Sequence, residues 1–239
     1  PTIRKVAKLG KLNANQVIEN RVNQADKYAF STKDLGLHLG ITGKNLTVEG
    51  YDVSHHAGKH AVASAVRFSS RGPEKSMYRL FNIPKELSGN DIGSMKHVLD
   101  RRINNASINP LPDIILIDGG KLQLDAALNT FAALVKKPPM ILSIVKGSKR
   151  VRSTETILSK DGIIEMPKDG SGFLLLQQIR DESHRFAITS NRKKKNKSLR
   201  KSSLDTINGL GPKKKKNLLN YFKSIQSIKA ASVIDLCKV

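Results

Sequence analysis

The chain has 239 residues, enough for one domain of good size or a medium domain with a small appendage. It has no run of about 18 apolar residues, no N-terminal signal peptide pattern and one cysteine, Cys237, which excludes a membrane span, an internal disulfide and a thiolate metal site. These features predict a soluble cytoplasmic protein with no membrane partner.

The charge of the chain is strongly positive. Lys and Arg number 42 against 20 acidic residues, which gives a formal net charge of +22 and a sequence pI near 10.2. Such a charge favours a polyanionic partner, because each neutralised phosphate releases condensed counterions. A generally Lys-rich composition or a merely solvated basic surface would give the same numbers. The charge therefore indicates nucleic acid without establishing it.

The first part of the chain is predicted to be a helix followed by a three-stranded meander. Apolar residues recur at i, i+3, i+4 and i+8 over residues 13–30, which predicts an amphipathic helix, and a short Gly-punctuated connection is expected from Asp34 to Gly43. From Leu46 the period changes to two. Strands are expected over Leu46–Ser54, Ala61–Phe68 and Ser76–Ile83. Their short connections predict an antiparallel meander.

Alternating helices and strands follow the meander. The expected elements are a helix near Asn90–Ala106, a buried strand at Asp113–Asp118, a helix at Lys121–Val135, a second buried strand at Met140–Val145, a small hairpin as one interpretation of Glu155–Met166, and a final helix at Ser171–Ala187. The order β-β-β-α-β-α-β-α predicts an α/β domain over about residues 47–190, with a mixed sheet and helices on its faces. This is the order of the ribonuclease-H-like fold, although several folds share it.

Residues 191–239 differ in composition from the domain before them. Residues 191–202 carry seven Lys and Arg within ten positions and no acid, a block that repels itself and is interpreted as a flexible basic linker. Residues 203–239 show two short helical patterns around Gly209-Leu210-Gly211-Pro212, which predicts a small all-α appendage.

Two aspartates on apolar strands are the strongest candidates for chemistry. Asp52 lies within the first strand, and Asp118 ends the first strand after the meander. An unpaired charge in such a frame is costly, and a shared divalent cation removes that cost. Mg²⁺ and Mn²⁺ prefer carboxylate oxygens and leave positions open for a phosphate. The alternative is that each aspartate caps a loop or pairs with a lysine.

Four further residues could join this site. His184, in R-D-E-S-H-R on the last helix, could bind metal, position water or protonate a leaving oxygen, or be an ordinary helix residue. Asp91 is a third acidic ligand or a first-turn helix acid. Lys121 and Lys146 each follow a buried strand and could contact phosphate or be solvated.

His55, His56 and His60 also cluster in the sequence. They fall in a loop between strands rather than at i, i+4 on a helix, and no Cys joins them. A zinc site is therefore not indicated.

The glycine-rich segment of the tail has a pattern that favours phosphate binding. Gly209 and Gly211 allow a tight hairpin whose backbone N–H groups can approach a phosphate, beside the next helix and the cations from Lys213 to Lys216. DNA-backbone binding is the preferred interpretation, and a plain helix–turn–helix connection is the alternative.

Taken together, five stretches resemble the C-terminal half of the UvrC family, the dual-incision nucleases of bacterial nucleotide excision repair. In chain order they are Y-D-V-S-H, G-N-D-I-G-S-M-K-H-V-L-D-R-R, D-I-I-L-I-D-G-G-K-L-Q-L, I-R-D-E-S-H-R-F-A-I with R-K-K-K behind it, and S-L-D-T-I-N-G-L-G-P-K. They cover about residues 47–220, and as a set they are far more specific than any one alone. Residues 1–46 match more loosely.

The resemblance implies a metal-dependent nuclease with an Asp-Asp-His site in a ribonuclease-H-like domain. The matching positions are Asp52, Asp118 and His184, and Asp91 also falls at an acidic position of the family pattern. The resemblance further implies the cut 5′ of the lesion in damaged double-stranded DNA, with UvrB as partner and UvrA acting earlier. Contacts to DNA are expected from the helix-hairpin-helix tail and its basic flank, at Arg192, Lys193, Lys194, Lys195, Gly209, Gly211 and Lys213. Lys121, at the start of the helix after Asp118, is a further expected DNA contact.

The sequence also departs from the family pattern. The N-terminal GIY-YIG nuclease that makes the 3′ cut, the acidic segment that docks to UvrB and a second hairpin are not among these residues. We therefore expect a fragment or a shortened relative. The competing hypotheses are an endonuclease-V-like repair nuclease and a non-catalytic DNA-binding module with structural carboxylates.

Overall fold

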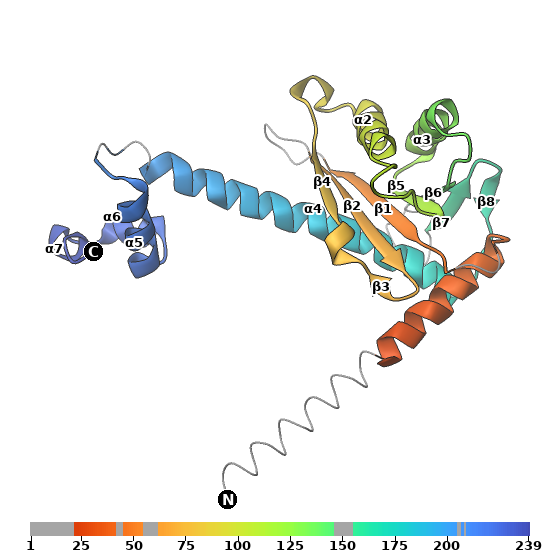
Figure 1. Cartoon of the computed structure of the whole chain (residues 1–239), viewed down its shortest axis with the longest axis horizontal. Coiled ribbons are helices and arrows are strands. Elements are labelled where there is room, and N and C mark those ends of the chain that lie inside the picture. The colour runs from red at the N-terminus through yellow and green to blue at the C-terminus, as the bar shows by residue number, and fades with distance from the viewer. Residues whose placement is uncertain (1–21, 42–44, 55–61, 146–154, 205–206, 208) are drawn as a thin grey trace, which may run out of the picture. The chain divides into compact units, whose positions relative to one another are not determined.

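The computed structural model describes residues 22–41, 45–54, 62–145, 155–204, 207 and 209–239. It divides into two compact units, residues 1–187 and 188–239. The first unit is built on one mixed sheet of eight strands, in the order β3-β2-β1-β5-β6-β7-β8, with β4 pairing to β2 (Figure 1).

The strands alternate with helices in the predicted manner. The strands are β1 Val48–Ser54, β2 Val62–Ser69, β3 Gly72–Pro73, β4 Arg79–Asn82, β5 Ile114–Asp118, β6 Met140–Val145, β7 Thr156–Ser159 and β8 Gly162–Ile164. The helices of this unit are α2 Asp91–Asn104, α3 Lys121–Leu134 and the first part of α4 Ser171–Leu204, whose residues from 188 on belong to the second unit. The unit also has 3-10 turns at Lys75–Met77 and Lys85–Leu87 and an N-terminal helix that the structure describes over residues 22–38. The meander, both parallel strands and the β7–β8 hairpin confirm the predicted order.

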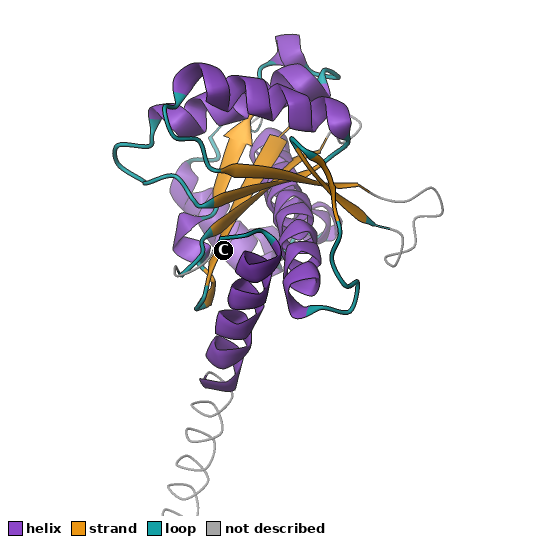
Figure 2. Ribbon diagram, turned by 90° about the vertical axis from the view of Figure 1, so that its right-hand side faces the viewer, coloured by secondary structure: helices purple, strands orange, loops and turns teal. Residues whose placement is uncertain are grey.

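Helices cover both faces of the sheet (Figure 2). The helices α2 and α3 lie on one face, where they pack against Tyr51 and Ile117. The N-terminal helix and α4 lie on the other face, against Val48 and Leu116. Each strand therefore contributes alternate residues to two apolar cores, as the period of two requires.

Two predictions about irregular segments were wrong. The N-terminal helix continues to residue 38, through the first half of the connection predicted from Asp34 to Gly43. The helix α4 continues without interruption through residues 191–202, which were predicted to be a flexible linker. No Pro or Gly occurs between Gly172 and Gly209, and Lys and Arg are good helix formers, so local propensity outweighs charge repulsion there.

The second unit contains three short helices after the end of α4. These are α5 Pro212–Phe222, α6 Ile225–Ala230 and α7 Val233–Leu236. Gly209 has a φ of 84°, a left-handed conformation that favours glycine, and Pro212 opens α5 at the first helical position. In the part of the chain that the structure describes, no helix is long and apolar enough to cross a membrane.

Candidate active site

The register of the sheet places Asp52 and Asp118 next to each other. The parallel strands β1 and β5 are neighbours, and Tyr51 pairs with Ile117 one residue before the two aspartates. Because Tyr51 and Ile117 face α2 and α3, Asp52 and Asp118 point to the opposite face, which α4 covers. The prediction that these strands are neighbours at the centre of the sheet is confirmed.

The helix α4 adds His184 to the two carboxylates. Asp52 is only 5% exposed, and its Oδ2 lies 3.0 Å from Nδ1 of His184, whose side chain is 48% exposed. Asp118 is half-buried, and one ligand atom from each of the three residues lies within 4.8 Å of the other two. This trio is the only group of three or more His, Cys, Asp or Glu side chains with such spacing among the described residues. The three candidate ligands predicted from the sequence therefore meet in space.

The donor set fits a small divalent cation. Two carboxylates and one imidazole suit Mn²⁺ and, through the oxygens, Mg²⁺. Ligands that each lie about 2.1 Å from one ion are at most about 4.2 Å apart, so small side-chain adjustments bring the three atoms into range. The half-exposed His184 and Asp118 leave one side of the group open to solvent, where a substrate can approach.

Close packing of α4 on β1 carries His184 to this place. Gly50 lies two residues before Asp52, and a Cβ atom at that position would collide with Cγ2 of Ile179. The absent side chain lets the helix approach the strand closely. One turn later, the hydroxyl of Ser64 on β2 donates to the carbonyl oxygen of Ser183 over 2.8 Å, and both serines are fully buried.

A buried ion pair holds the same helix from the other side. Arg180 on α4 donates to Glu155, which precedes β7, and both side chains are at most 6% exposed. Arg180 also binds Asp181, and Gln177 donates to Glu155 over 2.8 Å. Burial opposes the charge of Arg180, but the hydrogen bonds that its guanidinium donates to the carboxylates of Asp181 and Glu155 prevail and raise its pKa.

Aromatic and charged contacts secure the next turn of α4. Phe186 packs edge-on against Tyr78, with ring centroids 5.2 Å apart. Glu182 binds Arg185, which lowers the pKa of the Glu182 carboxyl. Asp181 and Glu182 thus have other partners, which agrees with the expectation that the three polar residues of R-D-E-S-H-R do not all point to one site.

The structure does not bring every predicted residue to the trio. Asp91 is exposed at the start of α2, where Asn90 caps the helix by accepting from the N–H of Gly93, and it is not part of the Asp-Asp-His group. Lys121 is exposed at the first position of α3, three residues after Asp118. Both remain predictions as site residues.

Some candidates lie where the structure gives no side-chain description. His55, His56, His60 and Lys146 fall outside the described residues. Only the helical backbone is described at Arg192, Lys193, Lys194 and Lys195. Their proposed roles in metal or DNA binding therefore stay predictions.

The structure describes Ile207 and residues 209–213 of the predicted phosphate-binding hairpin, and the role of the hairpin stays a prediction. Gly209 adopts its positive φ, Gly211 is the N-cap residue of α5, and Lys213 is exposed in the first turn. No acidic residue occupies that first turn, and its charged residues are lysines.

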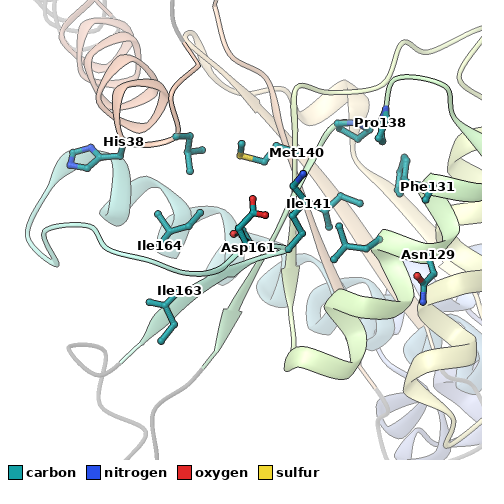
Figure 3. Close-up of a pocket in the computed structure, with 15 residues that line it drawn as sticks. His38, Asn129, Phe131, Pro138, Met140, Ile141, Asp161, Ile163 and Ile164 are labelled. Atoms are coloured by element: carbon teal, nitrogen blue, oxygen red, sulfur yellow. Dashed lines mark hydrogen bonds between the residues drawn. The ribbon is translucent and has the colours of Figure 1, made fainter.

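A cavity of about 800 Å³ lies at the other end of the strands (Figure 3). It is lined by Met140 and Ile141 of β6, Phe131 of α3 and Ile163 and Ile164 of β8. Met140 pairs with Ile114, the first residue of β5, whereas Asp118 is the last. This apolar cavity is therefore separate from the carboxylate edge.

Sequence reasoning did not identify the residues that orient α4. Ser64 interrupts the apolar face of its strand, and Ser183 stands directly before His184, so the signal was a polar residue at a core-facing position. Glu155 and Arg180 gave no such signal, because charged residues are usually exposed.

Fold and site together define a ribonuclease-H-like domain with an Asp-Asp-His group at the carboxyl edge of its sheet. Residues 37–188 match the family model described as the UvrC RNase H endonuclease domain. The chain belongs to the UvrC family. This match confirms the family resemblance of the sequence stretches that lie within these residues.

Two relatives, both named UvrABC system protein C, match nearly the whole chain. The UvrABC system protein C of Hahella chejuensis is 38% identical over 235 residues, which is 97% of this chain and 38% of that protein. That of Yersinia enterocolitica is 37% identical over 239 residues, 97% of this chain and 39% of that protein. The chain thus spans somewhat more than a third of the length of these relatives.

One solved structure among the similar ones is the catalytic domain of human endonuclease V. It is 16% identical, with a TM-score of 0.34, and the match covers 66% of this chain and 85% of that one. A similarity at this level supports no argument about function.

Proposed function

We propose that this chain is a divalent-metal-dependent DNA endonuclease that makes the 5′ incision in bacterial nucleotide excision repair. One observation carries the proposal: Asp52, Asp118 and His184 converge at one sheet edge in a member of the UvrC family. The proposed substrate is damaged double-stranded DNA, and the proposed partner is UvrB, with UvrA acting earlier.

Asp52 and Asp118 would hold Mg²⁺ or Mn²⁺ through their carboxylate oxygens. The bound cation would supply an activated water and offset the charge on the leaving oxygen. His184 lies within hydrogen-bond distance of Asp52, so it can complete the metal shell or carry a proton at Nδ1. Asp91 is proposed as an additional acidic group near the start of α2.

The DNA backbone would be held by groups outside the trio. We assign Lys121, the basic residues Arg192, Lys193, Lys194 and Lys195, and the hairpin from Gly209 through Gly211 to Lys213 to this role. These groups would contact phosphates rather than base edges, which gives binding without sequence preference.

The first test is to remove each carboxylate with little change in shape. In Asp52→Asn and Asp118→Asn, the Mn²⁺-dependent nicking of supercoiled plasmid should fall at least about 100-fold, while duplex affinity in a gel-shift assay stays near that of the native chain. The control is Asp161→Asn, an exposed aspartate in the β7–β8 turn. Full nicking activity in either site variant would refute the assignment. Incision of a damaged duplex with UvrB present then tests the 5′ position of the cut.

A further inference from the structure

One face of β2 is covered by α4, and on that face Ser64 is the only residue of the strand with a polar side chain. Its neighbours on that face, Val66 and Phe68, are buried in the apolar cluster beneath α4. Ser64 itself is fully buried and donates to the main-chain oxygen of Ser183 over 2.8 Å. An alanine at this position would leave no polar atom of the strand unsatisfied.

The helix does not need this hydrogen bond for its own integrity. Within an α-helix, the carbonyl of Ser183 already accepts the N–H of Ala187, four residues on. Ser64 thus supplies a second donor to a carbonyl that has one. The fold alone would accept an apolar residue here, which indicates that the serine serves the placement of the helix.

The hydrogen bond joins the helix to the strand pair at the level of the site. Ser64 is the register partner of Asp52 on β1, and Ser183 is the residue directly before His184. The carboxylate and the group that holds the helix therefore sit side by side on paired strands. A shift of the helix by one residue would move His184 by about 1.5 Å and turn it by about 100°.

We propose that Ser64 is a positioning residue that fixes His184 against Asp52, so that the metal-binding trio is assembled before the ion arrives. The inference rests on the proposed function, because it assigns the trio to a metal. It extends that function to a residue that touches neither metal nor substrate. Placement errors of about 1 Å reduce rates by about 100-fold in other enzymes, so such a residue has a measurable effect.

The test compares Ser64→Ala with Thr130→Val in the intact chain. Thr130 is also a buried residue, on α3 at the opposite face of the sheet, and its hydroxyl donates to the carbonyl oxygen of Ala126 over 2.8 Å. Both variants remove one buried hydroxyl-to-carbonyl bond, but only Ser64→Ala removes the link to α4. Mn²⁺ affinity is measured by isothermal titration calorimetry, and kcat and KM are measured in the plasmid assay.

In Ser64→Ala, the dissociation constant for Mn²⁺ should increase about tenfold and kcat should fall at least about tenfold, with KM for DNA unchanged. Thr130→Val should bind Mn²⁺ like the native chain, and Ser64→Thr, which keeps the hydroxyl, should recover most of the affinity. Native Mn²⁺ affinity and kcat in Ser64→Ala would overturn the inference and leave the nuclease intact. A native chain that binds no Mn²⁺ would instead overturn the proposed function itself.

Discussion

Asp34 shows how a single carboxylate can join two helices from distant parts of the chain. It lies in the N-terminal helix and accepts from the N–H of Gly172 over 2.7 Å and from the hydroxyl of Ser171 over 2.9 Å, at the start of α4. The N–H of Gly172, together with that hydroxyl and despite partial burial, holds the pKa of the Asp34 carboxyl below its ordinary value of 3.8. Asp34 thus acts as an N-cap for α4 supplied by another helix.

The ionised Asp34 should stabilise the fold in a pH-dependent manner. Because its folded pKa is depressed, its contribution is complete above the ordinary value of 3.8 and is lost as the pH falls through the lower folded value. Asp34→Ala should cost about 1 kcal/mol of unfolding free energy at pH 7, and the difference from the native chain should shrink below pH 3.8. Urea unfolding at several pH values measures this. Asp26→Ala, an exposed aspartate of the same helix, should cost much less, and an equal loss would contradict the cap.

At the scale of elements, α4 has two roles. It covers one apolar core of the sheet, and it carries His184 of the candidate site. The strands below it present Gly50 and Ser64, and the β7–β8 hairpin presents Glu155 to Arg180. These contacts come from three different strands or their ends. The helix is therefore held in one register along its packed segment.

Removal of the buried cation on α4 should be far more costly than removal of an exposed one. Arg180→Met leaves the buried Glu155 without its ion-pair partner, which should cost about 3 kcal/mol in urea unfolding. Arg185→Met provides the matched control on the same helix, because Arg185 is 58% exposed and pairs with Glu182 near the surface. That control should cost less than about 1 kcal/mol. Similar losses in both variants would show that burial of the Arg180 pair does not govern stability.

The elements were predictable where periodicity was strong. The alternation of Ala63 and Ala65 with Ser64 and Val66 assigned two faces to β2, and the structure has them on those faces. Gly36 and its neighbouring glycines suggested a loop, but a Cβ atom at Gly36 would collide with the carbonyl oxygen of Ile41, so a glycine is required within the compact helix end. Here the close local packing of the helix end against Ile41 outweighs the low helix propensity of glycine.

The candidate metal ligands could be predicted from the sequence, but the residues that position them could not. Asp52 and Asp118 stand on apolar strands, and the order of elements makes these strands neighbours. Ser64 gave a much weaker signal, since its partner Ser183 is 119 residues away and a single serine on a strand is common. Only the packing of α4 shows which serine matters.

At the scale of the whole molecule, the trio and all the proposed DNA-backbone contacts except Lys121 belong to different compact units. The trio lies in residues 1–187, whereas the hairpin at Gly209 and Lys213 lies in residues 188–239. With a net charge of +22, attraction to DNA is distributed over the chain, so single neutral substitutions should weaken binding only in part.

Neutralising the cations beside the hairpin should separate binding from chemistry. The double variant Lys213→Gln and Lys214→Gln should lower DNA affinity and reduce the salt slope of log K by about 0.9 for each phosphate that the variant no longer neutralises. The nicking rate at saturating DNA should be unchanged, because neither lysine belongs to the trio. Fluorescence anisotropy from low to high salt measures the slope. Lys229→Gln on α6 is the control for charge alone, and an equal effect per charge there would argue against specific phosphate binding by the hairpin.

The contact between Gly50 and Ile179 restricts which amino-acid substitutions these two positions can accept during evolution. The two positions share one volume between β1 and α4, so a larger residue at 50 is accommodated only by a smaller one at 179. If Gly50 were replaced first by a larger residue, α4 and its His184 would be pushed away from the carboxylates. If Ile179 were replaced first by a smaller residue, only a small void would open. The order of substitutions at these two positions therefore matters. A smaller residue at position 179 of the helix has to come before a larger residue at position 50 of the strand.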